Sequence, residues 1–112
     1  MNSKNYSVDA VLTKTRIEQI IEDATMDCYS EEEVFSGWFC FLEEKLLTPQ
    51  ECQTGKTQGV LVKLLQAQGG LAIHAKIRLE KQKSNVIVPI EYVVLLDKQQ
   101  DIFVQAYKQW LV

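Results

Sequence analysis

Hydrophobic residues in the first part of the chain recur at the spacing of an α-helix. Four aliphatic side chains lie on one face of a helix predicted over residues 16–26: Ile17, Ile20, Ile21 and Ala24. Thr15 and Glu18 have the spacing of a capping box, which marks the start of a helix. The first dozen residues show no sustained period, so the sequence predicts a loose N-terminal arm over residues 1–15, or else a short edge strand.

A second helix is predicted to open at Ser30, which forms a capping box with Glu33. Its apolar residues cover most of one side of the helix: Val34, Phe35, Trp38, Phe41, Leu42 and Leu46. Such an apolar helix is expected to cross the middle of the fold. Gly37 interrupts it and suggests close packing at that point, and Pro49 is expected to end it.

The period then changes to two, which is typical of β-strands. Val60, Val62 and Leu64 alternate with Leu61 and Lys63, and Gly69-Gly70 predicts a turn. In the clearest strand five residues are expected to face one way: Leu71, Ile73, Ala75, Ile77 and Leu79. The polar partners of that strand are His74, Lys76, Arg78 and Glu80. Two short strands, over residues 86–88 and 92–96, follow a hairpin loop.

Helical spacing returns at the end of the chain. Asp97 is a candidate cap, and the apolar positions fall at i, i+3, i+4 and i+7: Phe103, Ala106, Tyr107 and Trp110. The predicted fold class is therefore α+β, with two N-terminal helices, a small antiparallel, barrel-like sheet and a C-terminal helix. We expect a single domain over residues 16–112.

Composition excludes several classes of protein. The chain has 112 residues, of which 46% are hydrophobic and 24% charged, as in an ordinary globular domain. No run approaches the roughly 20 apolar residues of a membrane span, and no secretory signal is recognisable, so we expect a cytoplasmic protein without a membrane partner. Three cysteines without a C-x-x-C pair favour reduced thiols, and Cys28 and Cys40 are expected to be buried.

The charges are distributed unevenly. Residues 1–56 carry five bases and eleven acids, whereas residues 57–112 carry seven bases and four acids. Every charged residue between Arg16 and Lys45 is an acid. A field of one sign attracts counter-ions, so the acidic half predicts a cation as its ligand and opposes nucleic acid. In the second half, four bases on one face of the predicted sheet could contact phosphates: Lys76, Arg78, Lys81 and Lys83. No aromatic residue alternates with them to stack on bases, so the sequence favours a solvated sheet face over nucleic-acid binding.

The sequence does not predict an enzyme. Gly55-Lys56-Thr57 resembles the end of a phosphate-binding loop, but Gln50 stands where that motif needs glycine, so an exposed turn is expected. His74 is the single histidine, and no nucleophile motif accompanies it. Acids in the first turn of a helix are explained by the helix dipole before acid–base catalysis is needed.

A looser group of acids is the candidate metal site. Asp23 and Asp27 lie near the end of the first helix, and Glu31, Glu32 and Glu33 open the second. Calcium prefers six to eight hard oxygen ligands, and helices that turn back on each other could let Asp27 share a cation with these glutamates. The alternative is a solvated face between two well-capped helices.

The chain resembles the CcbP-type calcium-binding family over about residues 16–111. The most specific stretch is residues 27–49, where Asp27, Tyr29 and three glutamates precede Gly37-Trp38, a Leu42-Glu43 pair and Pro49. The resemblance implies a small bacterial cytoplasmic protein that binds Ca²⁺ through clustered surface acids. Matched by position, those acids are Asp27, Glu31, Glu32, Glu33 and Glu43. Gln50 departs from the aromatic residue that the family usually places after the proline.

Two functions are thus expected from the sequence. The first is non-catalytic, weak calcium binding at the junction of the two N-terminal helices, with six candidate ligands: Asp23, Asp27, Glu31, Glu32, Glu33 and Glu43. The alternative is a protein-interaction module without a metal. Such a module, which could be a homodimer, would use the second or the closing helix as an apolar surface. Its support is the number of aromatic residues, four Phe, four Tyr and two Trp.

Overall fold

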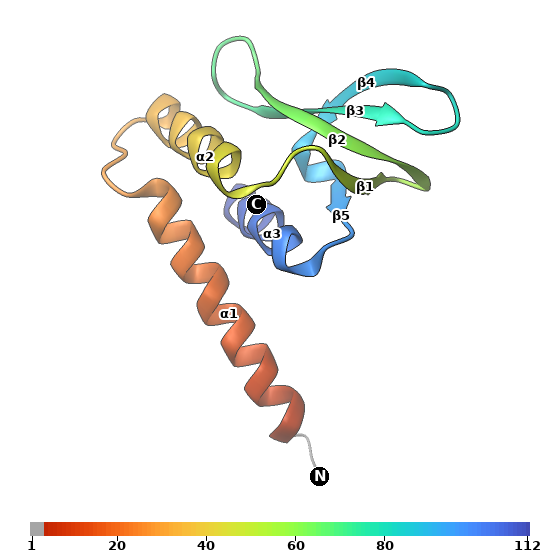
Figure 1. The fold of residues 1–112 in the computed structure, drawn as a ribbon. Helices are drawn as coiled ribbons and strands as arrows, with labels where there is room; N and C mark the ends of the chain where they lie inside the picture. Colours follow the sequence, from red (N-terminus) through yellow and green to blue (C-terminus); the bar gives the residue numbers. More distant parts are fainter. Residues whose placement is uncertain (1–3) are drawn as a thin grey trace.

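The computed structural model describes residues 4–112, and the side chains of residues 11–112. Three helices lie on one side of a five-stranded antiparallel sheet (Figure 1), which confirms the predicted α+β class. The elements in chain order are α1 (Lys4–Thr25), α2 (Glu31–Lys45), β1 (Gln50–Thr54), β2 (Thr57–Gln66), β3 (Ile73–Leu79), β4 (Ser84–Pro89), the 3₁₀ turn η1 (Ile90–Tyr92), β5 (Val93–Leu95) and α3 (Lys98–Leu111).

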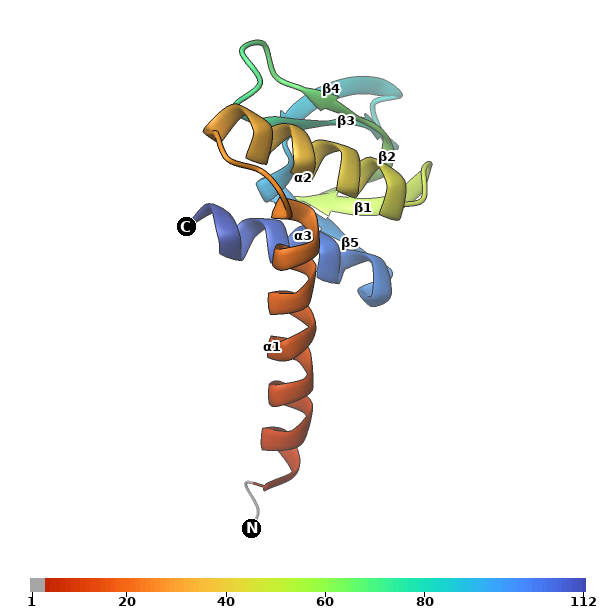
Figure 2. The same ribbon diagram turned by 90° about the vertical axis from the view of Figure 1, so that its left-hand side faces the viewer.

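Helix α1 is much longer than its apolar pattern predicts. It begins at Lys4, so residues 4–15 are helical and do not form the expected loose arm, while residues 1–3 lie outside the described part. The expected cap at Thr15 is also wrong, because Thr15 lies inside the helix. Apolar periodicity marks only the packed half, Ile17–Ala24, and the N-terminal half extends beyond the rest of the fold (Figure 2).

Helix α2 begins as the sequence predicts. The Ser30 hydroxyl accepts a hydrogen bond from the Glu33 amide, and the Glu33 carboxylate accepts one from the Ser30 amide, both at 3.1 Å. The predicted close packing at Gly37 is confirmed, because a Cβ there would lie 2.8 Å from the Ala24 carbonyl oxygen. Glycine therefore lets α2 lie directly against the end of α1.

The sheet has the strand order β4-β3-β2-β1-β5 and is open, so the barrel-like closure expected from the sequence is wrong. Strand β1 was not predicted. In β2 a bulge between Leu61 and Lys63 places both Leu61 and Leu64 in the core, and not the expected set of Val60, Val62 and Leu64. In β3 the predicted alternation holds from Ile73 to Leu79, but Leu71 precedes the strand and is 46% exposed.

The core lies between the sheet and the helices. Trp38 of α2 is fully buried and meets Tyr107 and Trp110 of α3 at 5.4 and 5.8 Å between ring centroids. Phe41 of α2 likewise meets Phe103 of α3 at 5.9 Å. Aromatic pairs of this kind contribute about 0.5–1.5 kcal/mol each beyond the burial of their surface. The apolar faces of α2 and α3 are therefore used within the chain.

The cysteines differ from the prediction. Cys52 is the buried one, whereas Cys40 is exposed and Cys28 is half-buried, and all three are free thiols. Burial raises the pKa of Cys52 to about 11, which keeps it a neutral thiol. None of the described helices combines the length and the apolarity needed to cross a membrane.

Candidate functional site

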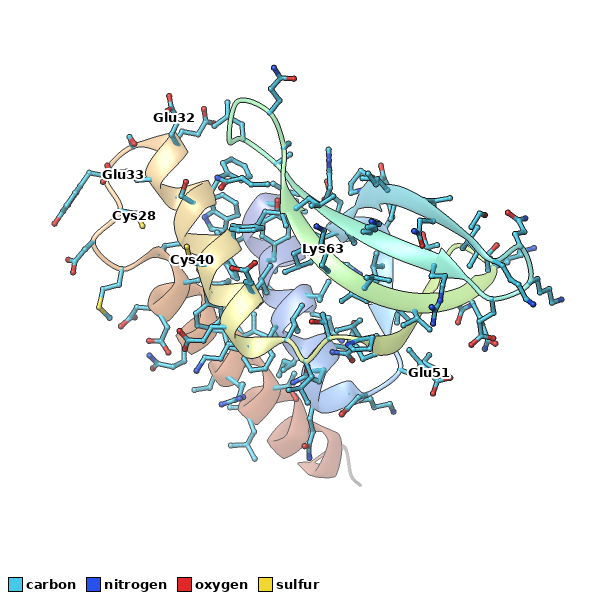
Figure 3. The ribbon with its side chains drawn as sticks, turned by 45° about the horizontal axis from the view of Figure 1, so that its top comes forward. Cys28, Glu32, Glu33, Cys40, Glu51 and Lys63 are labelled. Atoms are coloured by element: carbon cyan, nitrogen blue, oxygen red, sulfur yellow. The ribbon has the colours of Figure 1, made fainter. Side chains whose placement is uncertain are left out.

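Five of the six candidate ligands lie on one bend of the chain, where α1 ends and α2 begins. We call this surface the acidic corner; its members are Asp23, Asp27, Glu31, Glu32 and Glu33. All five residues are exposed. Figure 3 shows Glu32 and Glu33 at the outer end of α2, next to the connection that carries Cys28.

The bend is built by local backbone interactions. The Cys28 amide donates a hydrogen bond to the Thr25 carbonyl at 3.2 Å, which closes the turn after α1. Asp27 has a φ of 59°, in the left-handed region that aspartate tolerates better than most residues. The capping box of Ser30 then starts α2 immediately. The chain therefore reverses within a few residues, which holds the two acidic helix ends on one corner.

The carboxylates of the corner are engaged to different degrees. Asp23 accepts a hydrogen bond from the Gln19 amide at 3.0 Å, and Glu33 is committed to the capping box. For Asp27, Glu31 and Glu32 the described residues provide no hydrogen bond or ion pair. These three side chains are therefore the freest to rotate toward a ligand.

The structure does not gather the candidates into a ready-made metal site. Among the described residues, no three His, Cys, Asp or Glu side chains are close enough together to hold a metal ion. Glu43 is remote from the corner, because it lies on α2 more than three turns after Glu31, roughly 18 Å along the helix axis. The corner thus offers separate carboxylates on a fixed backbone.

A second charged surface lies on the sheet, where the sequence indicated the basic face of β3 but not its pairing with Lys63. Lys63 on β2 and Lys76 on β3 are direct cross-strand partners, and both point away from the core. The sequence shows the two lysines 13 positions apart but not the register that pairs them, because the bulge in β2 shifts that register by one residue. His74, the single histidine, is half-buried on the same face.

The fold is similar to two solved structures. One is the crystal structure of Anabaena CcbP, with a TM-score of 0.72 and 15% sequence identity over 88% of this chain and 89% of that chain. The other is described as a calcium-binding protein in the calcium-binding form. Its TM-score is 0.71 and its identity 14%, over 86% of this chain and 89% of the other. At such identities the likeness establishes a shared fold. No family model and no curated protein sequence matches the chain.

Proposed function

We propose that the protein binds Ca²⁺ weakly, without catalysing a reaction, at the acidic corner. The observation that carries the proposal is the concentration of five exposed carboxylates on one reversal of the chain, residues 23–33. The shared fold supports it, because one of the two similar structures is a calcium-binding protein in the calcium-binding form.

Helix dipoles indicate where in the corner a cation is most stable. The C-terminal end of α1 carries partial negative charge and free carbonyl oxygens, which are ligands that calcium accepts. The N-terminal end of α2 carries partial positive charge, which its three glutamates offset. We therefore place the ion near Asp27, on the side of α1, with Glu31 or Glu32 reaching toward it.

Weak binding follows from the cost of gathering these ligands. No three of the described carboxylates are preassembled, so the ion must fix side chains that are free in its absence. Each ordered glutamate loses up to about 1.5–2 kcal/mol of rotamer freedom. Repulsion between the converging carboxylates adds to this cost until the ion neutralises it.

Isothermal titration with Ca²⁺ tests the proposal. The Asp27→Asn/Glu31→Gln variant is expected to bind Ca²⁺ at least about tenfold more weakly than the unmodified protein, since two direct ligands lose their charge. The matched control is Glu51→Gln/Glu80→Gln, which removes the same charge from exposed residues outside the corner. The affinity of the single variant Glu43→Gln for Ca²⁺ shows whether that distant carboxylate contributes to calcium binding.

Two results would overturn the proposal. Loss of all calcium heat at about 150 mM salt would mean a screened, diffuse attraction and no site. Equal affinity of the corner variant and its control would mean that calcium binds elsewhere.

A further inference from the structure

The sheet has one face that no described helix covers. Helices α1, α2 and α3 all lie on the core side, and the opposite side is open in both views of the ribbon (Figures 1 and 2). Residues on this outer sheet face are exposed or half-buried, in contrast to the fully buried alternate positions of β3. The face is thus a surface of the molecule and not part of its interior.

The outer sheet face is basic. Strands β2, β3 and β4 contain no acid, and their charged residues are Lys63, Lys76 and Arg78. Within the described part of the chain, none of these three forms an ion pair. The one acid on the five strands is Glu51 of β1, which is a full strand away from Arg78, with Val60 between them.

The arrangement of these bases costs stability. Lys63 and Lys76 face each other across β2 and β3, and like charges in direct opposition destabilise a sheet. The next residue in the same row is Ile87 of β4, paired with Lys76 and 58% exposed. Two opposed lysines beside an exposed isoleucine fit an acidic partner that also makes an apolar contact.

The acidic corner has this complementary character. Besides its five acids it carries two large apolar side chains in solvent, Met26 at 60% and Tyr29 at 86% exposure. Tyrosine and methionine are enriched where proteins bind one another. The corner therefore combines negative charge with exposed apolar side chains, and the outer sheet face combines positive charge with the exposed Ile87 of its edge strand β4.

The residue types on the outer sheet face favour a protein over a nucleic acid. Apart from the Lys63–Lys76 pair, the cross-strand neighbours of its basic side chains are aliphatic or small polar residues: Val60, Ile87 and Asn85. Sheets that bind single-stranded nucleic acid place aromatic rings at such positions to stack on the bases. No Phe, Tyr or Trp lies on β2, β3 or β4.

We propose that the outer sheet face of one copy of this protein binds the acidic corner of a second copy. The two surfaces lie at different places on the molecule, as Lys63 and Glu32 show in Figure 3. The copy that uses its sheet face keeps its corner free, and the copy that uses its corner keeps its sheet face free, so the contact is head-to-tail. Such contacts form rings or open chains, whereas a symmetric dimer through the sheet would set Lys63 and Lys76 against their own copies.

Charge reversal tests the proposal by sedimentation velocity in about 20 mM salt, where surface charges are little screened. The unmodified protein is expected to sediment faster as its concentration rises. Lys63→Glu/Lys76→Glu reverses the charge of the outer sheet face, and Glu31→Lys/Glu32→Lys removes most of the negative charge of the corner without touching the Glu33 cap. Each variant alone is expected to self-associate at least about tenfold more weakly.

Mixing supplies the decisive measurement. An equimolar mixture of the two variants pairs the intact corner of one with the intact sheet of the other, so faster-sedimenting complexes are expected to return. Such recovery also shows that both variants are folded. The matched control is Lys56→Glu/Lys81→Glu, which has the same charge change on exposed residues outside the strands and is expected to associate like the unmodified protein.

Three outcomes would overturn the proposal. The first is an unmodified protein that stays monomeric up to about 1 mM in low salt. The second is a mixture of the two variants that stays monomeric although each alone is folded by circular dichroism. The third is a labelled single-stranded DNA oligonucleotide that binds the unmodified protein but not Lys63→Glu/Lys76→Glu, in the absence of self-association.

Discussion

Gly37 determines how closely α1 and α2 approach, and this gives a prediction at the scale of one residue. A Cβ at Gly37 would lie 2.8 Å from the Ala24 carbonyl oxygen and 3.0 Å from the Cys28 sulfur. Alanine would otherwise favour the helix by about 0.5–1 kcal/mol. The contact is with backbone and outweighs that gain, so Gly37→Ala is expected to lower the free energy of unfolding by about 1–2 kcal/mol.

Urea denaturation measures this change, and Cys40→Ala is the control, one turn further along α2 at an exposed position. The control is expected to stay within about 0.5 kcal/mol of the unmodified protein. Equal or greater stability of Gly37→Ala would show that the two helices separate at no cost. Because Gly37 packs on the corner, Gly37→Ala should also disturb the bend around Asp27.

Tyr107 makes the stability of the fold depend on pH in the alkaline range. Burial, with a smaller contribution from the nearby Glu91 carboxylate, raises the pKa of Tyr107 to about 12 from a usual value of 10.0. A raised pKa means that the neutral phenol is the form the fold stabilises, so its contribution is complete below pH 10 and is lost as pH rises toward 12. The raised pKa of Cys52, about 11, acts in the same direction from pH 9 upward.

We therefore expect the free energy of unfolding to fall steeply between pH 10 and 12, and Tyr107→Phe to make that fall shallower. Urea denaturation at several pH values measures it, with Tyr92→Phe as the control because Tyr92 is exposed. An identical pH profile for Tyr107→Phe and the unmodified protein would contradict this role of Tyr107.

The sequence places the candidate ligands on the correct elements but not in a final geometry. Asp23, Glu31 and Glu33 lie on the helix ends that the pattern predicts, because capping and periodicity are local properties. Neighbouring residues do not fix the rotamer of an exposed carboxylate. Spacing along the sequence therefore does not predict whether several carboxylates point toward one ion. Glu43 is a different case, because its spacing of twelve residues from Glu31 on one helix already places it roughly 18 Å away.

At the scale of elements, Asp101 joins α3 to the sheet. It is the buried charged residue of the core, and its carboxylate accepts hydrogen bonds from the Leu95 amide at 2.9 Å and the Gln105 side chain at 2.8 Å. Asp101→Ala leaves the Leu95 amide without its partner at the end of β5. The expected loss in the free energy of unfolding is about 1–3 kcal/mol.

Asp97→Ala provides the comparison for this prediction, because it removes only the exposed cap of α3, the hydrogen bond to the Gln99 amide. Its expected cost is about 1 kcal/mol, less than that of Asp101→Ala. Thermal unfolding of the two variants measures which of them is less stable. The reverse order would mean that β5 and α3 do not depend on this contact.

Elements that depend on distant parts of the chain were the ones that sequence patterns missed. Strand β1, Gln50–Thr54, is polar apart from Cys52 and exists because β2 and β5 pair with it on either side. The bulge near Val62 depends on the register with β3. By contrast, the alternation of buried and outward-facing residues in β3 and the cap of α2 depend on residues close together in the sequence, and both were predicted correctly.

At the scale of the whole molecule, the uneven charge of the sequence becomes two surfaces at different places. Five of the eleven acids of the first half lie at the bend between α1 and α2, and the bases of β2 and β3 lie on the outer sheet face. Separated charges of opposite sign orient molecules before they touch. The same corner is thus proposed to meet either a small cation or the sheet of another copy.

Competition for the acidic corner is the prediction that links the two proposals. An ion held near Asp27 neutralises the charge that the outer sheet face of a neighbour would meet, so Ca²⁺ is expected to weaken self-association. By linkage, association must weaken calcium binding by the same factor. Sedimentation velocity with and without Ca²⁺ measures the first effect, and titration at low and high protein concentration measures the second. Sodium chloride at matched ionic strength is the control, because it screens both surfaces without a site. Association that Ca²⁺ leaves unchanged or strengthens would show that the ion and the neighbouring copy do not compete for the corner.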